Sequence, residues 1–184
     1  MQRGENVEFT REVPNATRVA VGVAWNAGNE TALADNLVTA AILCDVHNRA
    51  LSEGHFVFFN QLASPELSVR DLDRALGQDQ DQIEIDLPAV PPEVERVVVV
   101  LYVNDGPAQR RTLRQLRSCV VRLLDAASNT ELLRSQDLVP ELQNETALAL
   151  AEVYRRGTGW RFKVLGQGYA NGVAGVLADY GLSV

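Results

Sequence analysis

The strongest constraint on the fold is a series of short apolar segments separated by turn residues. Residues 19–25 alternate valine and tryptophan with alanine and glycine, so both faces of this predicted strand are apolar or small. Residues 82–87 alternate cleanly, with isoleucine and leucine facing inward and polar residues, Gln82 among them, facing outward. The valine-rich run 96–103 is the strongest strand signal. Many short strands and few long helical periods predict a mainly β protein, either a sandwich or a barrel.

Other segments predict how the strands connect and where helices lie. Residues 37–45 and 56–60 flank a turn-like stretch and predict a hairpin. Residues 107–117 are the best helix candidate before the C-terminus, and residues 169–181 predict a closing helix that ends at Gly181. Since there is no βαβ alternation, no repeat and no linker, we expect one domain over the whole chain.

Residues 145–156 have two interpretations. Their alanine, leucine and glutamate content favours a helix. The turn that follows and the alternating residues 160–166 favour the first half of a β-hairpin instead. The residues alone leave both open.

Charge and hydropathy exclude some classes of function. The 184 residues carry a net charge of −7, which argues against non-specific binding to nucleic acid. The N-terminus lacks the apolar region of a signal peptide, and the longest apolar run, 97–103, is too short to span a bilayer. We therefore expect a cytoplasmic protein without a transmembrane segment. Cys44 and Cys119 lie in apolar runs and are expected to be buried, reduced thiols.

No sequence pattern indicates catalysis. The chain has no GxSxG or HExxH motif, and its only histidines are His47 and His55. The stretch 166–172 resembles a dinucleotide fingerprint, but Asn171 stands where the third glycine belongs. We therefore expect a non-catalytic protein. A basic face on the predicted helix is expected to be solvated rather than bound to phosphate, lipid or an acidic partner. It consists of Arg110, Arg111, Arg114 and Arg117.

The acidic window 66–86 carries the most chemistry. It holds seven acidic residues and two arginines, a net charge of −5. Calcium takes six to eight oxygen ligands, usually with several carboxylates on a flexible loop. The EF-hand pattern fails, however, because Asp79-x-Asp81 is followed by Ile83. From spacing alone, a solvated loop and a cation site both remain open.

Five segments, read in order, carry a family resemblance. They are "VAVGVAWN" (19–26), "FVFFNQLASPELSV" (56–69), "IEIDLPAVPPEV" (83–94), "VVRLLDAASNTELLRSQDL" (120–138) and "NETALALAEVYRRGTGWRFKVLGQGYANGVAGVL" (144–177). Over nearly its whole length the chain resembles the TerD-type tellurite-resistance and stress-response family. The resemblance implies a β-sandwich of two sheets with a few short helices, including one at the C-terminus, and makes 145–156 a strand. It also implies a non-catalytic cytoplasmic protein that binds calcium and acts with other Ter-type proteins near the membrane.

The chain departs from the family pattern at the calcium ligands. Asp35 stands at the first aspartate of one ligand segment, whereas Leu37 replaces the second. The stretch between the "ELSV" and "IEIDL" segments is shorter than the family pattern. The resemblance therefore leaves a reduced set of metal-ligand candidates, namely Asp35, Asp79 and Asp81, with Asp71 or Asp73 as substitutes. Fewer carboxylates predict weaker calcium binding. The alternative is a metal-free interaction paralogue that has lost the site.

Overall fold

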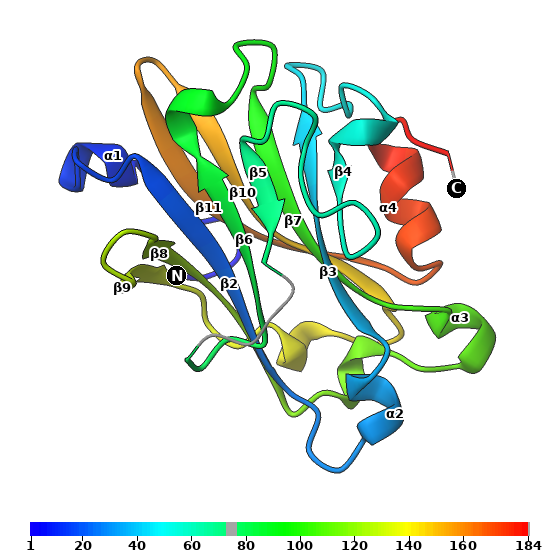
Figure 1. Cartoon of the computed structure of the whole chain (residues 1–184). Helices are drawn as coiled ribbons and strands as arrows, with labels where there is room; N and C mark the ends of the chain where they lie inside the picture. Colours follow the sequence, from blue (N-terminus) through cyan, green and yellow to red (C-terminus); the bar gives the residue numbers. More distant parts are fainter. Residues whose placement is uncertain (73–76, 184) are drawn as a thin grey trace.

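The chain folds into two antiparallel β-sheets packed face to face (Figure 1). The computed structural model describes residues 1–72 and 77–183. The larger sheet has the order β1 (Asn6–Val7), β11 (Gly159–Tyr169), β10 (Ala147–Arg156), β7 (Arg96–Val103), β3 (Leu37–Cys44) and β4 (Phe56–Val57). The smaller sheet has the order β5 (Val69–Asp71), β6 (Asp81–Asp86), β2 (Arg18–Asn26), β8 (Ser118–Asp125) and β9 (Thr130–Arg134). The predicted sandwich of two sheets is confirmed.

Short helical segments connect or cover the strands. The α-helices are α1 (Phe9–Glu12), α2 (Thr31–Ala34), α3 (Gly106–Gln109) and α4 (Val173–Asp179). The 3₁₀ turns are η1 (Glu53–His55), η2 (Leu87–Ala89), η3 (Leu113–Gln115) and η4 (Val139–Glu141). The predicted C-terminal helix is confirmed as α4, and Gly181 follows it with a φ of 76°, a left-handed conformation that favours glycine. No helix in the described part of the chain is long and apolar enough to cross a membrane.

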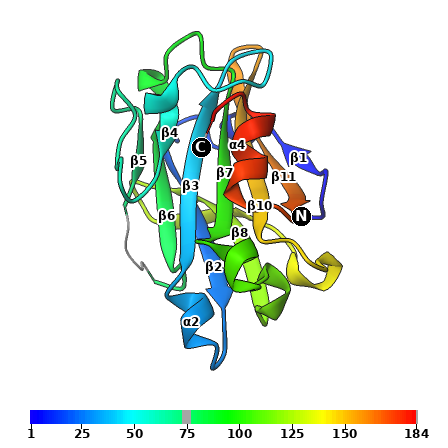
Figure 2. The ribbon, with the colours of Figure 1, turned by 90° about the vertical axis from the view of Figure 1, so that its right-hand side faces the viewer.

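The run 96–103 is continuously apolar because both faces of β7 are covered. Val97 and Val99 belong to the main core between the two sheets. Val98 and Val100 face the other way and pack with Val176 of α4. Figure 2 shows α4 lying over this outer face of the larger sheet. A strand buried on both faces has no need for the polar alternation of a half-exposed one.

Residues 145–156 contain a strand, as the family resemblance implies. β10 lies between β7 and β11, with Leu148 opposite Leu101 and Val153 opposite Phe162. These ladders and the burial of both faces outweigh the helix propensity of alanine and leucine. The predicted hairpin of residues 37–45 and 56–60 is also confirmed, because β3 pairs with β4.

The predicted helix at 107–117 is wrong. The segment contains α3, which ends at Arg110 with a φ of 55°, and the separate turn η3. A left-handed residue ends a helix, and the apolar residues that follow, Leu113 and Leu116, are buried in the main core. The four arginines therefore do not form one helical face. The prediction for the cysteines is confirmed, since Cys44 and Cys119 are free, buried thiols. Burial raises the pKa of each thiol to about 12.

Candidate functional site

The two ends of the sandwich carry two different concave sites. β6 connects them, since Asp81 at its start lines one site and Leu87 just beyond its end lines the other. Figure 1 shows the helices that border them, α2 and α1, at opposite ends of the molecule. We refer to the site near α2 as the acidic cavity and to the site near α1 as the tryptophan groove.

The acidic cavity brings together three of the five predicted metal ligands. It has a volume of about 280 Å³. Asp35 follows the last residue of α2, Asp71 ends β5 and Asp81 begins β6, so residues from three separate segments line the same cavity. The rest of the lining contains residues with neutral oxygen atoms, namely Asn36, Thr39 and Asn104, and the apolar residues Leu37, Val38 and Phe59. The role of these neutral residues could not be predicted from the acidic window 66–86, because they come from other parts of the chain.

The geometry limits what the acidic cavity can hold. Asp71 is 5% exposed. The burial of Tyr102, together with the negative charge of Asp71, raises the pKa of Tyr102 to about 12. Asp81 accepts a hydrogen bond from the Gln82 backbone N–H at 2.8 Å. Within residues 1–72 and 77–183, no three histidine, cysteine, aspartate or glutamate side chains converge closely enough to hold a metal ion. Asp73, the fourth predicted ligand, lies outside the described residues.

Asp79, the fifth predicted ligand, lies apart from this cavity and is engaged by an arginine. Arg122 Nε and Nη2 donate to its two carboxylate oxygens at 2.8 and 2.7 Å, and Gln82 Nε2 donates at 2.7 Å. The Asp79 side chain is 0% exposed and that of Arg122 is 6% exposed. Such a bidentate pair is among the strong hydrogen-bonded contacts in proteins. Asp79 is therefore placed to stabilise the sheet.

Gly22 makes room for this ion pair. It lies opposite Gln82 on β6 and Arg122 on β8, in one row across three strands. A Cβ atom at Gly22 would overlap the Asp79 carboxylate. Gln82 points to the outer face, as its alternation predicts, but it is 3% exposed because Asp79 covers it. Two sequence features could have indicated the pair, namely a glycine within an apolar strand and an arginine within another.

The segment 52–68, which runs from η1 through β4 to the loop before β5, holds a serine, a histidine and a glutamate in line, which the sequence did not predict. Ser52 Oγ lies 2.6 Å from His55 Nδ1, and His55 Nε2 lies 3.1 Å from Glu66 Oε2. Ser52 directly precedes η1, so its contact with His55 spans a single turn. Ser68 Oγ also donates to Glu66 at 2.7 Å. We interpret the arrangement as a tie between the two ends of this segment.

The contacts of Glu66 with His55 and Ser68 predict that the stability of the fold depends on pH. Burial alone would raise the pKa of Glu66, but hydrogen bonds from Ser68 and Ser64 and the nearby His55 outweigh it and lower that pKa below its ordinary value of 4.5. A lowered carboxyl pKa stabilises the fold above the unfolded value, and this contribution is lost as pH falls through the folded value. Thermal melts between about pH 3 and 7 should therefore show a shallower acid decline for Glu66→Gln than for the wild type. Parallel curves would contradict this assignment.

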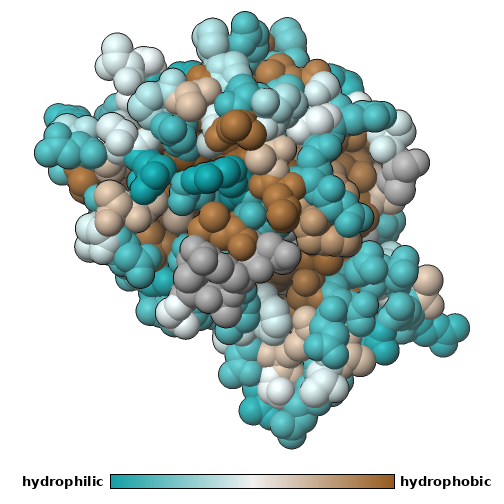
Figure 3. Space-filling model, in the orientation of Figure 1, coloured by the Kyte–Doolittle hydropathy of each residue, from teal (hydrophilic) through white to brown (hydrophobic). Residues whose placement is uncertain are grey.

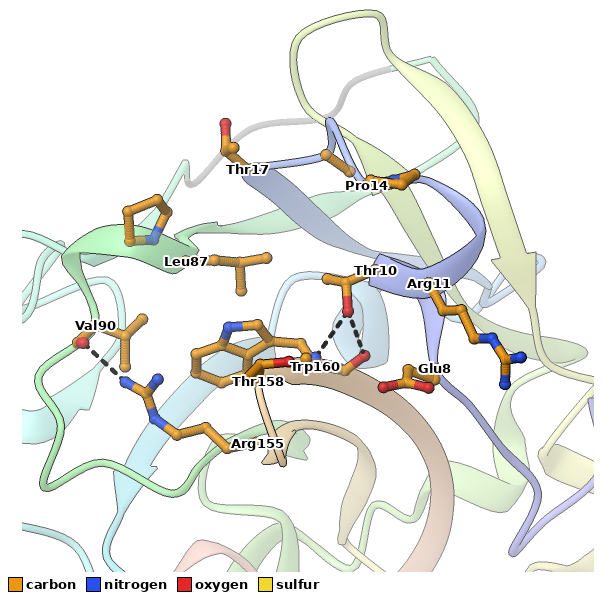
Figure 4. A pocket seen from close by; sticks show the side chains of 13 residues that line it. Glu8, Thr10, Arg11, Pro14, Thr17, Leu87, Val90, Arg155, Thr158 and Trp160 are labelled. Atoms are coloured by element: carbon orange, nitrogen blue, oxygen red, sulfur yellow. Dashed lines mark hydrogen bonds between the residues drawn. The ribbon is translucent and has the colours of Figure 1, made fainter.

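The tryptophan groove is the larger site, with a volume of about 730 Å³ (Figure 4). Its floor is Trp160, at the start of β11. Arg155, on β10, holds the indole from one side, with its guanidinium carbon 4.4 Å from the ring centroid. The guanidinium itself donates to backbone carbonyls of the proline-rich loop after β6. Its acceptors are Val94 O at 2.8 Å, Val90 O at 2.9 Å and Pro91 O at 3.0 Å.

The segment around α1 closes the other side of the groove. Thr10 Oγ1 accepts a hydrogen bond from the Trp160 backbone N–H at 2.9 Å. Gly159 leaves the space that Glu8 and Thr10 occupy, since a Cβ atom there would lie 2.7 Å from Glu8 Oε1. Sequence reasoning missed this groove because its residues come from segments more than sixty positions apart, and no spacing pattern joins them.

Comparison with known proteins gives consistent matches over the chain. A family model described as the TerD domain matches residues 1–180. The tellurium resistance protein TerD of Serratia marcescens is 32% identical over 187 residues, which cover 100% of this chain and 97% of that protein. General stress protein 16U of Bacillus subtilis (strain 168) is 30% identical over 189 residues, covering 100% of this chain and 97% of that protein.

A solved structure shares the fold. The crystal structure of a homologue of telluride resistance protein (TerD) from Streptomyces coelicolor A3(2) superimposes with a TM-score of 0.62 at 20% identity. The match covers 83% of this chain and 90% of that one. At this identity the likeness extends to the arrangement of the strands and helices.

Proposed function

The chain belongs to the TerD domain family, and we propose that it is a non-catalytic, cytoplasmic stress-response protein that binds calcium weakly at the acidic cavity and acts in a protein assembly. Its relatives are named as tellurium resistance and general stress proteins, which supports a stress-response role. The proposals of calcium binding and of assembly rest on the acidic cavity and the loop beside it.

The observation that carries the calcium proposal is the convergence of Asp35, Asp71 and Asp81 on one cavity from three separate segments. Carboxylates with neighbouring amide and hydroxyl oxygens form a hard donor set, which suits calcium rather than zinc or copper. The negative charges around the cavity would attract a cation. Because no three acids in the described part of the chain converge at metal distance, neutral oxygens and water would have to complete the coordination. Fewer charged ligands make the predicted affinity weak.

An exposed apolar loop beside the cavity supports the assembly proposal. Phe59 is 43% exposed and also lines the acidic cavity. Leu62 and Leu67 follow on the same loop, 49% and 66% exposed. Figure 3 shows apolar side chains gathered on this face, where β4 and β5 lie. Exposed apolar side chains that cluster mark contact surfaces in many proteins. Other Ter-type proteins near the membrane are the partners we propose.

A specific observation favours the alternative, a metal-free interaction paralogue. Asp79, one of the few aspartates kept from the family pattern, is paired with Arg122 instead of lining the cavity. In that case the apolar loop remains the functional surface and the acidic cavity is a solvated remnant.

Thermal melting with millimolar calcium against a chelator separates the two proposals. Ligand at 100 times its dissociation constant adds about 2.7 kcal/mol of stability, and each kcal/mol raises Tm by about 2–4 °C in a chain of this size. We expect calcium to raise Tm by several degrees and Asp35→Asn to remove most of that shift. The control is Glu12→Gln, which changes an exposed carboxylate of α1 at the opposite end of the molecule. This variant should keep the calcium-dependent rise in Tm. If calcium leaves Tm unchanged, the metal-free alternative stands.

The non-catalytic proposal has its own test. Among the side-chain hydrogen bonds of the described residues, one joins a serine to a histidine, namely Ser52 to His55. The wild type and Ser52→Ala should hydrolyse p-nitrophenyl acetate at the same rate as a solution of free histidine. Turnover above that background, lost in Ser52→Ala, would show that the contact is a nucleophile–base pair.

A further inference from the structure

The floor of the tryptophan groove presents a hydrogen-bond donor to whatever occupies the groove. Trp160 is 7% exposed, yet its indole nitrogen makes no hydrogen bond to any residue drawn in Figure 4. The nitrogen edge of the ring faces the side of the groove where Leu87 lies. Among the described residues, the enclosed side-chain nitrogens that lack a partner are Arg96 Nε and Arg161 Nε, so the Trp160 indole N–H is open to the groove, where water can accept its hydrogen bond. An acceptor atom of a bound molecule can therefore take the place of water at this donor.

The charge of the groove is positive, in contrast to the rest of the chain. Arg155 is half-buried and its hydrogen-bond acceptors are neutral carbonyl oxygens. Neither Arg155 nor Arg11 takes part in any ion pair found between described residues. Glu8 is the one acid in the lining, against these two arginines. The lining thus carries two positive charges against one negative charge, a net charge of +1 in a protein of net charge −7, which favours a negatively charged occupant.

The wall above the indole is apolar. Leu87 and Val90 are 5% and 4% exposed, and Pro88 lies between them in the chain. Pro14 contributes from the segment after α1. A volume of about 730 Å³ lies within the size range of small-molecule sites, and this wall supplies an apolar surface for part of such a molecule.

We propose that the tryptophan groove binds a small organic anion, an apolar body that carries a carboxylate. A carboxylate oxygen accepts the hydrogen bond of Trp160 Nε1, and the apolar body packs on Leu87, Pro88 and Val90. Arg155 acts beneath the ring as a positioning residue, since it fixes the indole and adds positive potential. Glu8 repels an anion from its own side of the groove, which favours the side where the indole nitrogen lies. This inference is independent of the calcium proposal, because the groove lies at the opposite end of β6.

The indole N–H signals in an NMR spectrum test the proposal directly. The chain has two tryptophans, so Trp25→Phe and Trp160→Phe assign the two signals. Benzoate and octanoate serve as ligands, and benzyl alcohol is the neutral match for benzoate. We expect a carboxylate to shift the Trp160 signal saturably and to leave the Trp25 signal in place. Charge-assisted hydrogen bonds are about twice as strong as neutral ones, so benzyl alcohol should bind about tenfold more weakly.

Two variants that leave both tryptophans in place keep the test independent of folding defects at Trp160. Glu8 is half-buried in the lining, and Glu8→Gln removes its repulsion, so this variant should strengthen carboxylate binding about three- to tenfold. Arg110→Gln, an exposed arginine beside α3 at the other end, should leave binding unchanged. The proposal is overturned if neither carboxylate shifts the Trp160 signal saturably, if benzyl alcohol binds as tightly as benzoate, or if Glu8→Gln binds benzoate no more tightly than Arg110→Gln does.

Discussion

Replacing Arg122 with leucine is expected to lower the free energy of unfolding by about 3–5 kcal/mol. The Asp79 side chain is fully buried and receives two of its hydrogen bonds from this arginine. Leucine would leave the carboxylate with Gln82 alone and no opposite charge beside it, because Arg122 is its ion-pair partner among the described residues. Removing one member of a buried ion pair leaves an uncompensated charge, which costs far more than the net value of the pair. Urea denaturation followed by circular dichroism measures the loss, and Tm should fall by about 6–20 °C.

A double variant and a surface variant control this experiment. Asp79→Leu combined with Arg122→Leu removes both charges and should recover part of the stability, since apolar replacements of a buried pair are often neutral. Arg134→Gln removes an ion pair with Glu131 that is partly exposed and should cost less than about 1 kcal/mol. If Arg122→Leu costs no more than Arg134→Gln, the buried pair does not stabilise the fold.

Gly22→Ala is expected to destabilise the protein by about 3 kcal/mol, the upper end of the range for overpacking. Alanine in the middle of a strand normally stabilises it relative to glycine. Here the added Cβ atom would overlap the Asp79 carboxylate, which the bidentate contact with Arg122 holds in place. The carboxylate would have to leave Arg122, so one methyl group disturbs the whole buried pair. Chemical denaturation of the single variant measures the effect.

Making Gly22→Ala in a protein that already carries Asp79→Ala separates the overlap with the Asp79 carboxylate from any general effect of the methyl group. With the carboxylate removed, the space above Gly22 is free, so Gly22→Ala should cost less than about 1 kcal/mol there or become stabilising. Equal costs in both backgrounds would show that the methyl group meets something other than Asp79.

Much of the β architecture could be predicted from local patterns. The valine run 96–103 and the alternation in 82–87 correspond to β7 and β6. Burial of apolar residues at strand spacing is a local property, so it is visible in the sequence. Residues 145–156 needed the family resemblance, because their propensity favours a helix and the neighbouring strands decide otherwise.

The failures in prediction have a common cause. The spacing of the arginines in 107–117 fits a helix, but Leu113 and Leu116 are buried in the core and a left-handed Arg110 ends α3. Asp79 belonged to the acidic window by sequence, but its ion-pair partner is Arg122, forty-three residues away. In each case the deciding contact is with a residue that no local window contains.

The sequence by itself determined the class of the fold, the family and the acidic character of one segment. Strand periodicity, the order of motifs and charge can all be read along the chain without knowing which residues meet in space. Only the tertiary structure decided what the acidic residues do. It placed Asp35, Asp71 and Asp81 around one cavity and turned Asp79 into the buried partner of Arg122. It also built the tryptophan groove at the opposite end, from segments that meet only when the sheets pack. The physical reason is that a charged group takes its role from the charges, donors and burial around it, and folding alone brings these together.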